Sequence, residues 1–194
     1  MHEFLPHIDK EVIQTLNNAA FNGEIVVVDN LRLVDSAVAY LSQFKELGFD
    51  TETRPSFHKG KKHKMALLQL SADDKAFLFR LHAIDIPESL ATLLADEDIK
   101  KIGAAVHDDI KGLAKITKFT PAGFVDLQKM VQDYGIIDKS VQKIAAIVLN
   151  VKVSKAQRLT NWENEELTDS QQLYAATDAW ICLKIYKKLL DSQN

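Results

Sequence analysis

Two carboxylates one residue apart are the first candidates for chemistry in this sequence. Asp50 and Glu52 follow the short apolar stretch that begins at Leu47. If this stretch is a strand, side chains alternate between its faces, so both carboxylates point the same way. They then repel each other, and a divalent cation is the obvious positive partner because hard cations bind carboxylate oxygens. Taken alone, the pattern favours a simpler interpretation, an acidic pair in solvent at the end of a strand.

A second acidic segment lies near the middle of the chain. Asp109 precedes Leu113 by four residues, so on a helix the two side chains share a face. The neighbouring Asp108 is then better placed as the helix cap. From this segment alone, the favoured interpretation is that both aspartates stabilise the positive end of the helix dipole.

A third acidic residue lies in the last predicted helix. Tyr174 and Asp178 are four residues apart, so the phenol and the carboxylate share a face. Ile181 and Ile185 continue that face and are expected to be buried. A carboxylate in a buried stripe is costly unless it is paired or bound to a metal ion. A metal site and a core ion pair with lysine or arginine are both compatible with Asp178.

Length and composition limit the class of protein. The 194 residues, 46% of them hydrophobic, suffice for one domain with a sizeable core. The net charge of −3 argues against coating nucleic acid by bulk charge, but not against local binding of a strand end. Cys182 is the only cysteine, which excludes an intrachain disulfide and a cysteine-type zinc site. We find no bilayer-spanning apolar run and no secretory pattern, and we expect a cytoplasmic protein without a membrane partner.

The predicted elements indicate an α/β domain. The early strands form an antiparallel meander, and the later alternation of strands and helices indicates a mixed central sheet with helices on both faces. Asp73 and Asp74 form the tight turn of a hairpin. We expect strands at 24–29, 47–53, 65–71, 76–81 and 100–105, and helices at 9–21, 35–44, 108–115 and 140–149, from Pro87, from Leu127 and from Thr168.

One domain over residues 1–194 is the simplest organisation, because the chain has no internal repeat and no linker rich in Pro, Gly or Ser. Its core is expected at about 24–190, with residues 1–23 as a helical N-terminal extension. The last helix is expected to bury a stripe that includes Leu173 and Ala176.

Two basic segments could bind the phosphates of a nucleic-acid strand. One contains Lys61 and Lys62 and follows the strand with the first carboxylate pair. Because lysine-rich loops are often simply solvated, we weigh both interpretations of this loop equally. The other is formed by Lys152, Lys155 and Arg158 before the last helix. Thr51 is a further candidate contact, whereas Trp162 could stack on a base but is more often a core residue.

Together these segments resemble the DEDD superfamily of 3′–5′ exonucleases, in its tyrosine-containing branch (DEDDy). Werner-type and ribonuclease D-like domains are the most similar. The matching motifs are residues 49–53 with 66–70, then 101–113, and then 167–179, with 124–126 and 158–162 as connecting segments. The resemblance implies a ribonuclease H-like fold and a site for two divalent cations, Mg²⁺ or Mn²⁺.

The resemblance also implies residue roles. By motif, Asp50, Glu52, Asp109 and Asp178 are the metal ligands, and Tyr174 lies beside the attacking water. The implied activity is removal of nucleoside 5′-monophosphates from nucleic acid with a free 3′ end. DNA is slightly favoured, and ribonuclease D-like trimming of RNA is the alternative. A catalytically silent nucleic-acid-binding module is a different class of hypothesis, and the complete acidic set and negative net charge count against it. A protein partner is possible, but no motif identifies one.

Overall fold

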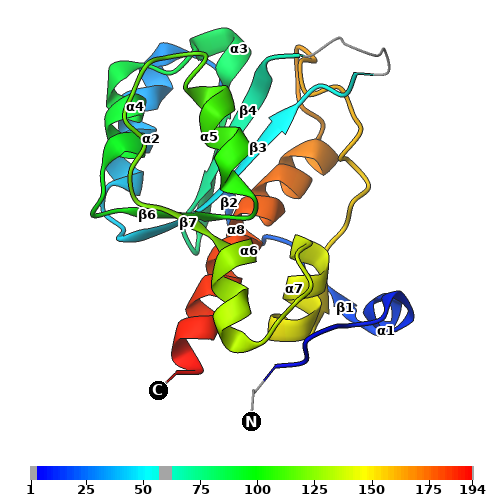
Figure 1. The fold of residues 1–194 in the computed structure, drawn as a ribbon. Helices are drawn as coiled ribbons and strands as arrows, with labels where there is room; N and C mark the ends of the chain where they lie inside the picture. Colours follow the sequence, from blue (N-terminus) through cyan, green and yellow to red (C-terminus); the bar gives the residue numbers. More distant parts are fainter. Residues whose placement is uncertain (1–3, 57–62, 194) are drawn as a thin grey trace.

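A six-stranded mixed sheet forms the centre of the computed structural model, which describes residues 4–56 and 63–193 (Figure 1). The strand order is β2-β5-β4-β3-β6-β7. The strands are β2 (Glu24–Val28), β3 (Glu46–Thr53), β4 (Met65–Ser71), β5 (Lys75–Arg80), β6 (Lys100–Gly103) and β7 (Phe124–Asp126). A separate two-stranded sheet pairs β1 (Asn17–Asn18) with β8 (Val151–Lys152).

The predicted antiparallel meander is confirmed. β3 pairs antiparallel with β4, and β4 pairs antiparallel with β5 across the turn that contains Asp73 and Asp74. The outer strands are parallel to their neighbours: β2 to β5, β6 to β3, and β7 to β6. Parallel neighbours need crossover connections, which the helices supply.

Helices cover both faces of the sheet, as predicted. Because side chains alternate along a strand, Leu68 and Leu70 of β4 join one core cluster whereas Leu67 joins another. The first cluster is covered by α2 (Leu31–Leu41), α3 (Leu81–Ile84), α4 (Glu88–Ala95) and α5 (Val106–Leu113). The opposite face carries α8 (Asp169–Asp191), α7 (Val141–Leu149), α6 (Leu127–Met130) and the 3₁₀ turn Val131–Tyr134.

The long helix α8 lies directly on β3 (Figure 1). Its start is set by a capping box in which Thr168 and Gln171 satisfy each other's backbone groups. Close approach is possible because β3 has Gly48 at the contact: a Cβ there would lie 2.0 Å from the carbonyl oxygen of Ala179. Neither α8 nor any other helix in the described part of the chain is long and apolar enough to cross a membrane.

Three predicted helix boundaries were wrong. The helix expected at 9–21 is only α1 (Lys10–Thr15), because the chain becomes extended at Leu16 and pairs through β1 with β8. The helix expected to begin at Asp35 begins at Leu31, since Asn30 accepts a capping hydrogen bond from the amide of Arg32.

The third boundary concerns α5. This helix begins at Val106 rather than near Asp108, so Asp108 lies within its first turn and is not its cap. Leu173 was also expected in the buried stripe of α8, but it is 39% exposed. Periodicity identified both helices correctly, but it did not fix the first residue of α5 or the edge of the buried stripe on α8.

The contact between Gly48 and Ala179 generates a stability prediction. Gly48→Ala should destabilise the protein by about 3 kcal/mol, because the added methyl meets rigid backbone and α8 must move. Gly112→Ala is the matched control: its Cβ would meet the flexible end of Met65, and alanine favours helix by about 1 kcal/mol. Urea denaturation measures both changes, and equal effects of the two substitutions would refute the close-packing account.

Candidate active site

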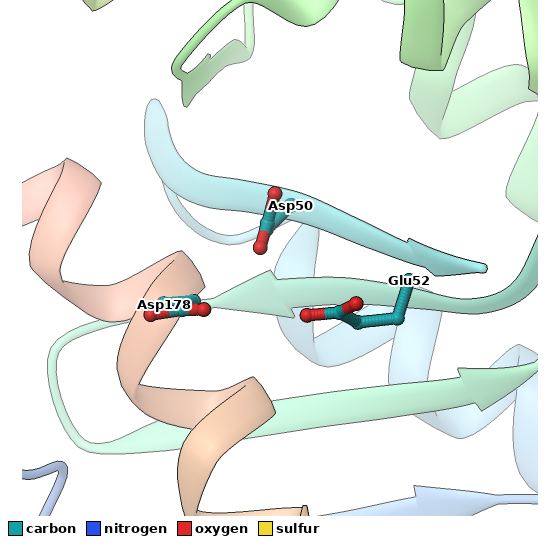
Figure 2. Close-up of side chains that lie close together, drawn as sticks. All are labelled: Asp50, Glu52 and Asp178. Carbon is teal, nitrogen blue, oxygen red and sulfur yellow. The ribbon is translucent and has the colours of Figure 1, made fainter. Parts of the chain in front are cut away.

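Three carboxylates from two elements meet beside the sheet. Asp50 and Glu52 project from one face of β3, and Asp178 projects from α8 toward them (Figure 2). Each of the three offers an oxygen, and these oxygens all lie within 4.8 Å of one another. The alternation along β3 and the packing of α8 therefore bring together three of the four acids that the family resemblance implied as metal ligands.

Burial and mutual repulsion raise the pKa values of these acids. Desolvation is the largest cause in each case. It raises the pKa of Glu52 to about 8, with Asp178 adding to the effect, and that of Asp178 to about 7. The pKa of Asp50 lies well above its usual range because of burial and the neighbouring Asp178. Removing water from closely spaced carboxylates makes their charged forms costly.

The described lysines and arginines form no direct ion pair with the clustered carboxylates. Among residues 4–56 and 63–193, no ion pair includes any of the three clustered carboxylates or Asp109. The core ion pair considered for Asp178 is therefore not present in this part of the chain. Closely spaced, unpaired carboxylate oxygens are the donor set that Mg²⁺ and Mn²⁺ prefer, so the residues fit a divalent cation.

Asp109 lies beside the cluster but is held by a different partner. It accepts a hydrogen bond from the Thr51 hydroxyl at 2.6 Å, and this bond lowers the carboxyl pKa while burial raises it to a net value of about 6. Thr51 was a candidate nucleic-acid contact, but here its hydroxyl is directed to Asp109. Asp108 is 92% exposed and pairs with Lys111, which distinguishes it from its neighbour.

Tyr174 lies within the site as a neutral hydrogen-bond donor. Burial, and next the negative charge of Asp178, raise the pKa of its phenol far above the ordinary value. Trp162 packs near the ring, with centroids 6.0 Å apart, and is fully buried. Trp162 is therefore a core residue that supports Tyr174, and base stacking is not available to it.

Two of the predicted basic residues share a hollow with the acids. A cavity of about 130 Å³ is lined by Asp50, Tyr174 and Asp178 together with Lys155 and Arg158. Arg158 lowers the pKa of Glu52 and Lys155 lowers that of Asp178, so both act on the cluster through space.

Lys152, the other described basic candidate, does not line this hollow. The amine of Lys152 instead donates to the carbonyl of Gln14 at 2.9 Å. Lys61 and Lys62 lie outside the described residues.

Sequence reasoning missed two features of the site. A neighbouring hollow of about 240 Å³ is lined by Tyr174 and Asp178 and also by Ala19, Ala20 and Leu173. Nothing in the local sequence indicated that residues 19–20 reach α8. The second feature is Gln69, which lies directly opposite Asp50 across β3 and β4. A polar residue within the apolar run of β4 was the available signal.

The raised pKa values predict an unusual pH dependence without divalent cations. Folded-state pKa values of about 6, 7 and 8 for Asp109, Asp178 and Glu52 exceed those of the unfolded chain. The folded state then binds more protons than the unfolded chain. The contribution of these acids to the free energy of unfolding is therefore largest below about pH 4 and is lost as pH rises to about 8. In chelator, the melting temperature should fall by about 5 °C or more between pH 5 and pH 8, equivalent to roughly 2 kcal/mol.

Two controls accompany this measurement. Glu52→Gln should flatten the pH dependence, and so should excess Mn²⁺, which binds the ionised carboxylates. A melting temperature that is constant or rises between pH 5 and pH 8 in chelator would contradict the assigned shifts.

Two proteins with nuclease names are similar to most of this chain. The chain is 33% identical over 155 residues to the bifunctional 3′–5′ exonuclease/ATP-dependent helicase WRN of Mus musculus, covering 77% of this chain and 11% of that protein. It is 31% identical over 164 residues to ribonuclease D of Haemophilus influenzae, covering 83% of this chain and 40% of that protein. The chain thus spans less than half the length of either relative.

Solved structures confirm the fold. The Nibbler EXO domain of Aedes aegypti superposes with a TM-score of 0.78 at 20% identity, over 90% of this chain and 94% of that one. The EXD2 exonuclease domain soaked in Mn superposes with a TM-score of 0.51 at 29% identity, over 87% and 90%. The mixed sheet with helices on both faces is ribonuclease H-like, as expected.

A family model described as 3′–5′ exonuclease matches residues 25–193. This range contains every clustered carboxylate, Asp109 and Tyr174. The predicted resemblance to DEDD exonucleases is confirmed, and the chain belongs to the 3′–5′ exonuclease family.

Proposed function

We propose that this chain is a metal-dependent exonuclease that hydrolyses the phosphodiester bond at the 3′ end of nucleic acid and releases nucleoside 5′-monophosphates. The observation that carries the proposal is the cluster of Asp50, Glu52 and Asp178, whose oxygens lie within 4.8 Å of one another without a basic partner among the described residues. Membership in the 3′–5′ exonuclease family supports it independently.

The proposed reaction is a simple hydrolysis. The oxygen of water bonds to phosphorus, the bond from phosphorus to the 3′ oxygen breaks, and that oxygen takes a proton to become the new 3′ hydroxyl. Two divalent cations, Mg²⁺ or Mn²⁺, would lower the pKa of water and stabilise charge on the attacking and leaving oxygens. Asp50, Glu52 and Asp178 are proposed to hold them, with Asp109 as a fourth ligand.

Tyr174 is proposed to orient the attacking water. Its raised pKa keeps the phenol protonated, so it cannot serve as a base near neutral pH. A neutral phenol can both donate and accept a hydrogen bond. Its position on α8 four residues before Asp178 and its packing near Trp162 support this role.

Lys155 and Arg158 are proposed to bind the phosphates of the substrate strand. Both line the hollow that contains Asp50 and Asp178, so a phosphate that approaches the acids also approaches these cations. Basic side chains at this position offset the repulsion between the acidic cluster and an anionic strand.

DNA is slightly favoured as the substrate because of the similarity to WRN. The similarity to ribonuclease D supports RNA as the alternative, and recognition of the 2′ hydroxyl would distinguish the two.

We further propose that residues 1–194 form one domain with its core at 24–190 and an N-terminal extension at 1–23. The single, buried Cys182 is consistent with the proposed cytoplasmic location.

The proposed activity is tested with 5′-labelled strands. Single-stranded DNA, duplex DNA with a recessed 3′ end and RNA are incubated with Mg²⁺, Mn²⁺ or chelator. We expect a ladder that shortens from the 3′ end only with a cation. Asp178→Asn should reduce the rate by roughly 100-fold or more, as removal of other charge-stabilising groups does. Tyr174→Phe should cost less, about tenfold, because it removes one hydrogen bond.

The same assay separates the competing hypotheses. Cleavage of RNA alone would support the ribonuclease D-like alternative. No cleavage of any strand, with chelator-insensitive binding to strand ends, would instead establish a silent nucleic-acid-binding module.

Arg158→Gln tests the proposed binding of substrate phosphates. KM should rise, because the variant loses a positive charge that binds the strand. KM should also depend less steeply on salt: the slope of log KM against log salt concentration should fall by about 0.7 for each phosphate contact that a single strand loses. Because Arg158 forms no ion pair among the described residues, stability should change little. Lys152→Gln is the control, since that amine is bonded to Gln14 and lies outside the acidic hollow. Equal salt dependence of KM in both variants and the wild type would exclude this role for Arg158.

A further inference from the structure

Gln69 is buried in the middle of the sheet without a hydrogen-bond partner in the described protein. Its side chain is fully buried, and neither its amide nitrogen nor its amide oxygen is hydrogen-bonded to another described residue. Two other buried polar side chains in the described residues are satisfied: the amine of Lys101 donates to two carbonyls, and Gln171 takes part in the helix cap. Single atoms of Arg80, Tyr134 and Trp162 also lack a partner, but Gln69 is the buried amide in which both polar atoms do. Buried polar groups usually have partners, so an amide that lacks them needs an explanation.

The strand register places this amide beside the acidic cluster. Gln69 on β4 is paired with Asp50 on β3 and with Leu78 on β5, and Leu78 is paired in turn with Val27 on β2. Residues paired across neighbouring strands point to the same face and lie close together. Asp50 is therefore the only polar neighbour of Gln69 in this cross-strand row, and the rest of the row is apolar.

The face to which this row points is covered. Leu78 belongs to the core cluster that includes Ala175 and Ala176 of α8, so the row is enclosed between the sheet and that helix. An amide in this position cannot turn to bulk solvent to satisfy its hydrogen bonds. A partner has to come from within the enclosed site, and Asp50 is the group that the register supplies.

Chemistry explains why an amide suits this position. A carboxylate that binds a cation through one oxygen can still accept hydrogen bonds from other groups. In metal sites such a hydrogen bond usually fixes the orientation of the ligating carboxylate. An amide N–H can donate to the ionised carboxylate without adding charge. A lysine or arginine at the same place would compete with the cation for the acid.

We propose that Gln69 is a positioning residue for Asp50: when this carboxylate binds a divalent cation, the Gln69 amide donates to it and fixes its orientation toward the cation. This inference rests on the proposed cation site and adds a group outside its set of ligands. Gln69 touches neither substrate nor cation in this role.

Gln69→Met tests the proposal because methionine is similarly long and unbranched but lacks the N–H donor. The readout is Mn²⁺ binding to the substrate-free protein, measured by isothermal titration calorimetry, together with melting temperature in chelator. We expect Mn²⁺ affinity to fall by about 10- to 100-fold, as for other partners of metal ligands. The melting temperature in chelator should be unchanged or higher, because the substitution removes an unsatisfied polar group from the cation-free protein.

Leu78→Met is the matched control, since it makes a similar change in the same row on the side away from Asp50. It should leave Mn²⁺ affinity within about twofold of wild type, because it removes no hydrogen-bond donor. Two results would overturn the role of Gln69: Mn²⁺ affinity in Gln69→Met equal to that of the control, or a clearly lower melting temperature in chelator, which would make the amide structural. Failure of the wild type itself to bind Mn²⁺ would instead refute the proposed cation site.

Discussion

The packing of α8 on β3 is the contact on which the rest of the site depends. It requires Gly48, because any side chain there would collide with the backbone at Ala179. Asp178 immediately precedes Ala179 on α8, and strand alternation places Asp50 and Glu52 on the same face of β3 as Gly48. The same close approach that buries the core thus forces like charges together, and the protein tolerates this arrangement at a cost in stability.

This cost links folding to ligand binding. Without a cation, desolvation and repulsion favour protonation of the acids and oppose the folded state near neutral pH. A cation that binds only the folded state offsets this destabilisation, so cation binding and folding favour each other. The Thr51–Asp109 hydrogen bond holds a fourth acid in place beside the cluster.

Local signals in the sequence were sufficient for most of the elements and for which side chains share a face, whereas the site itself was recognised only from the resemblance of the three acidic motifs together. The alternation around Asp50 and Glu52 and the i, i+4 spacing of Tyr174 and Asp178 depend only on strand and helix geometry. Long-range partners had no local signal. The parallel pairing of β2 with β5, the contact of residues 19–20 with the site and the cross-strand position of Gln69 are set by tertiary structure. Helix starts were wrong where a competing cap, such as Asn30, was overlooked.

The central claim is that these carboxylates form a cation site, and a crystal structure of the wild-type protein soaked in Mn²⁺ tests it most directly. Anomalous scattering identifies the ion without reference to activity. The account predicts an anomalous peak within about 2.0–2.6 Å of oxygens from Asp50, Glu52 or Asp178, the range for hard cations. A well-ordered cluster with no anomalous peak, or with a lysine or arginine amine bound between the carboxylates, would contradict it.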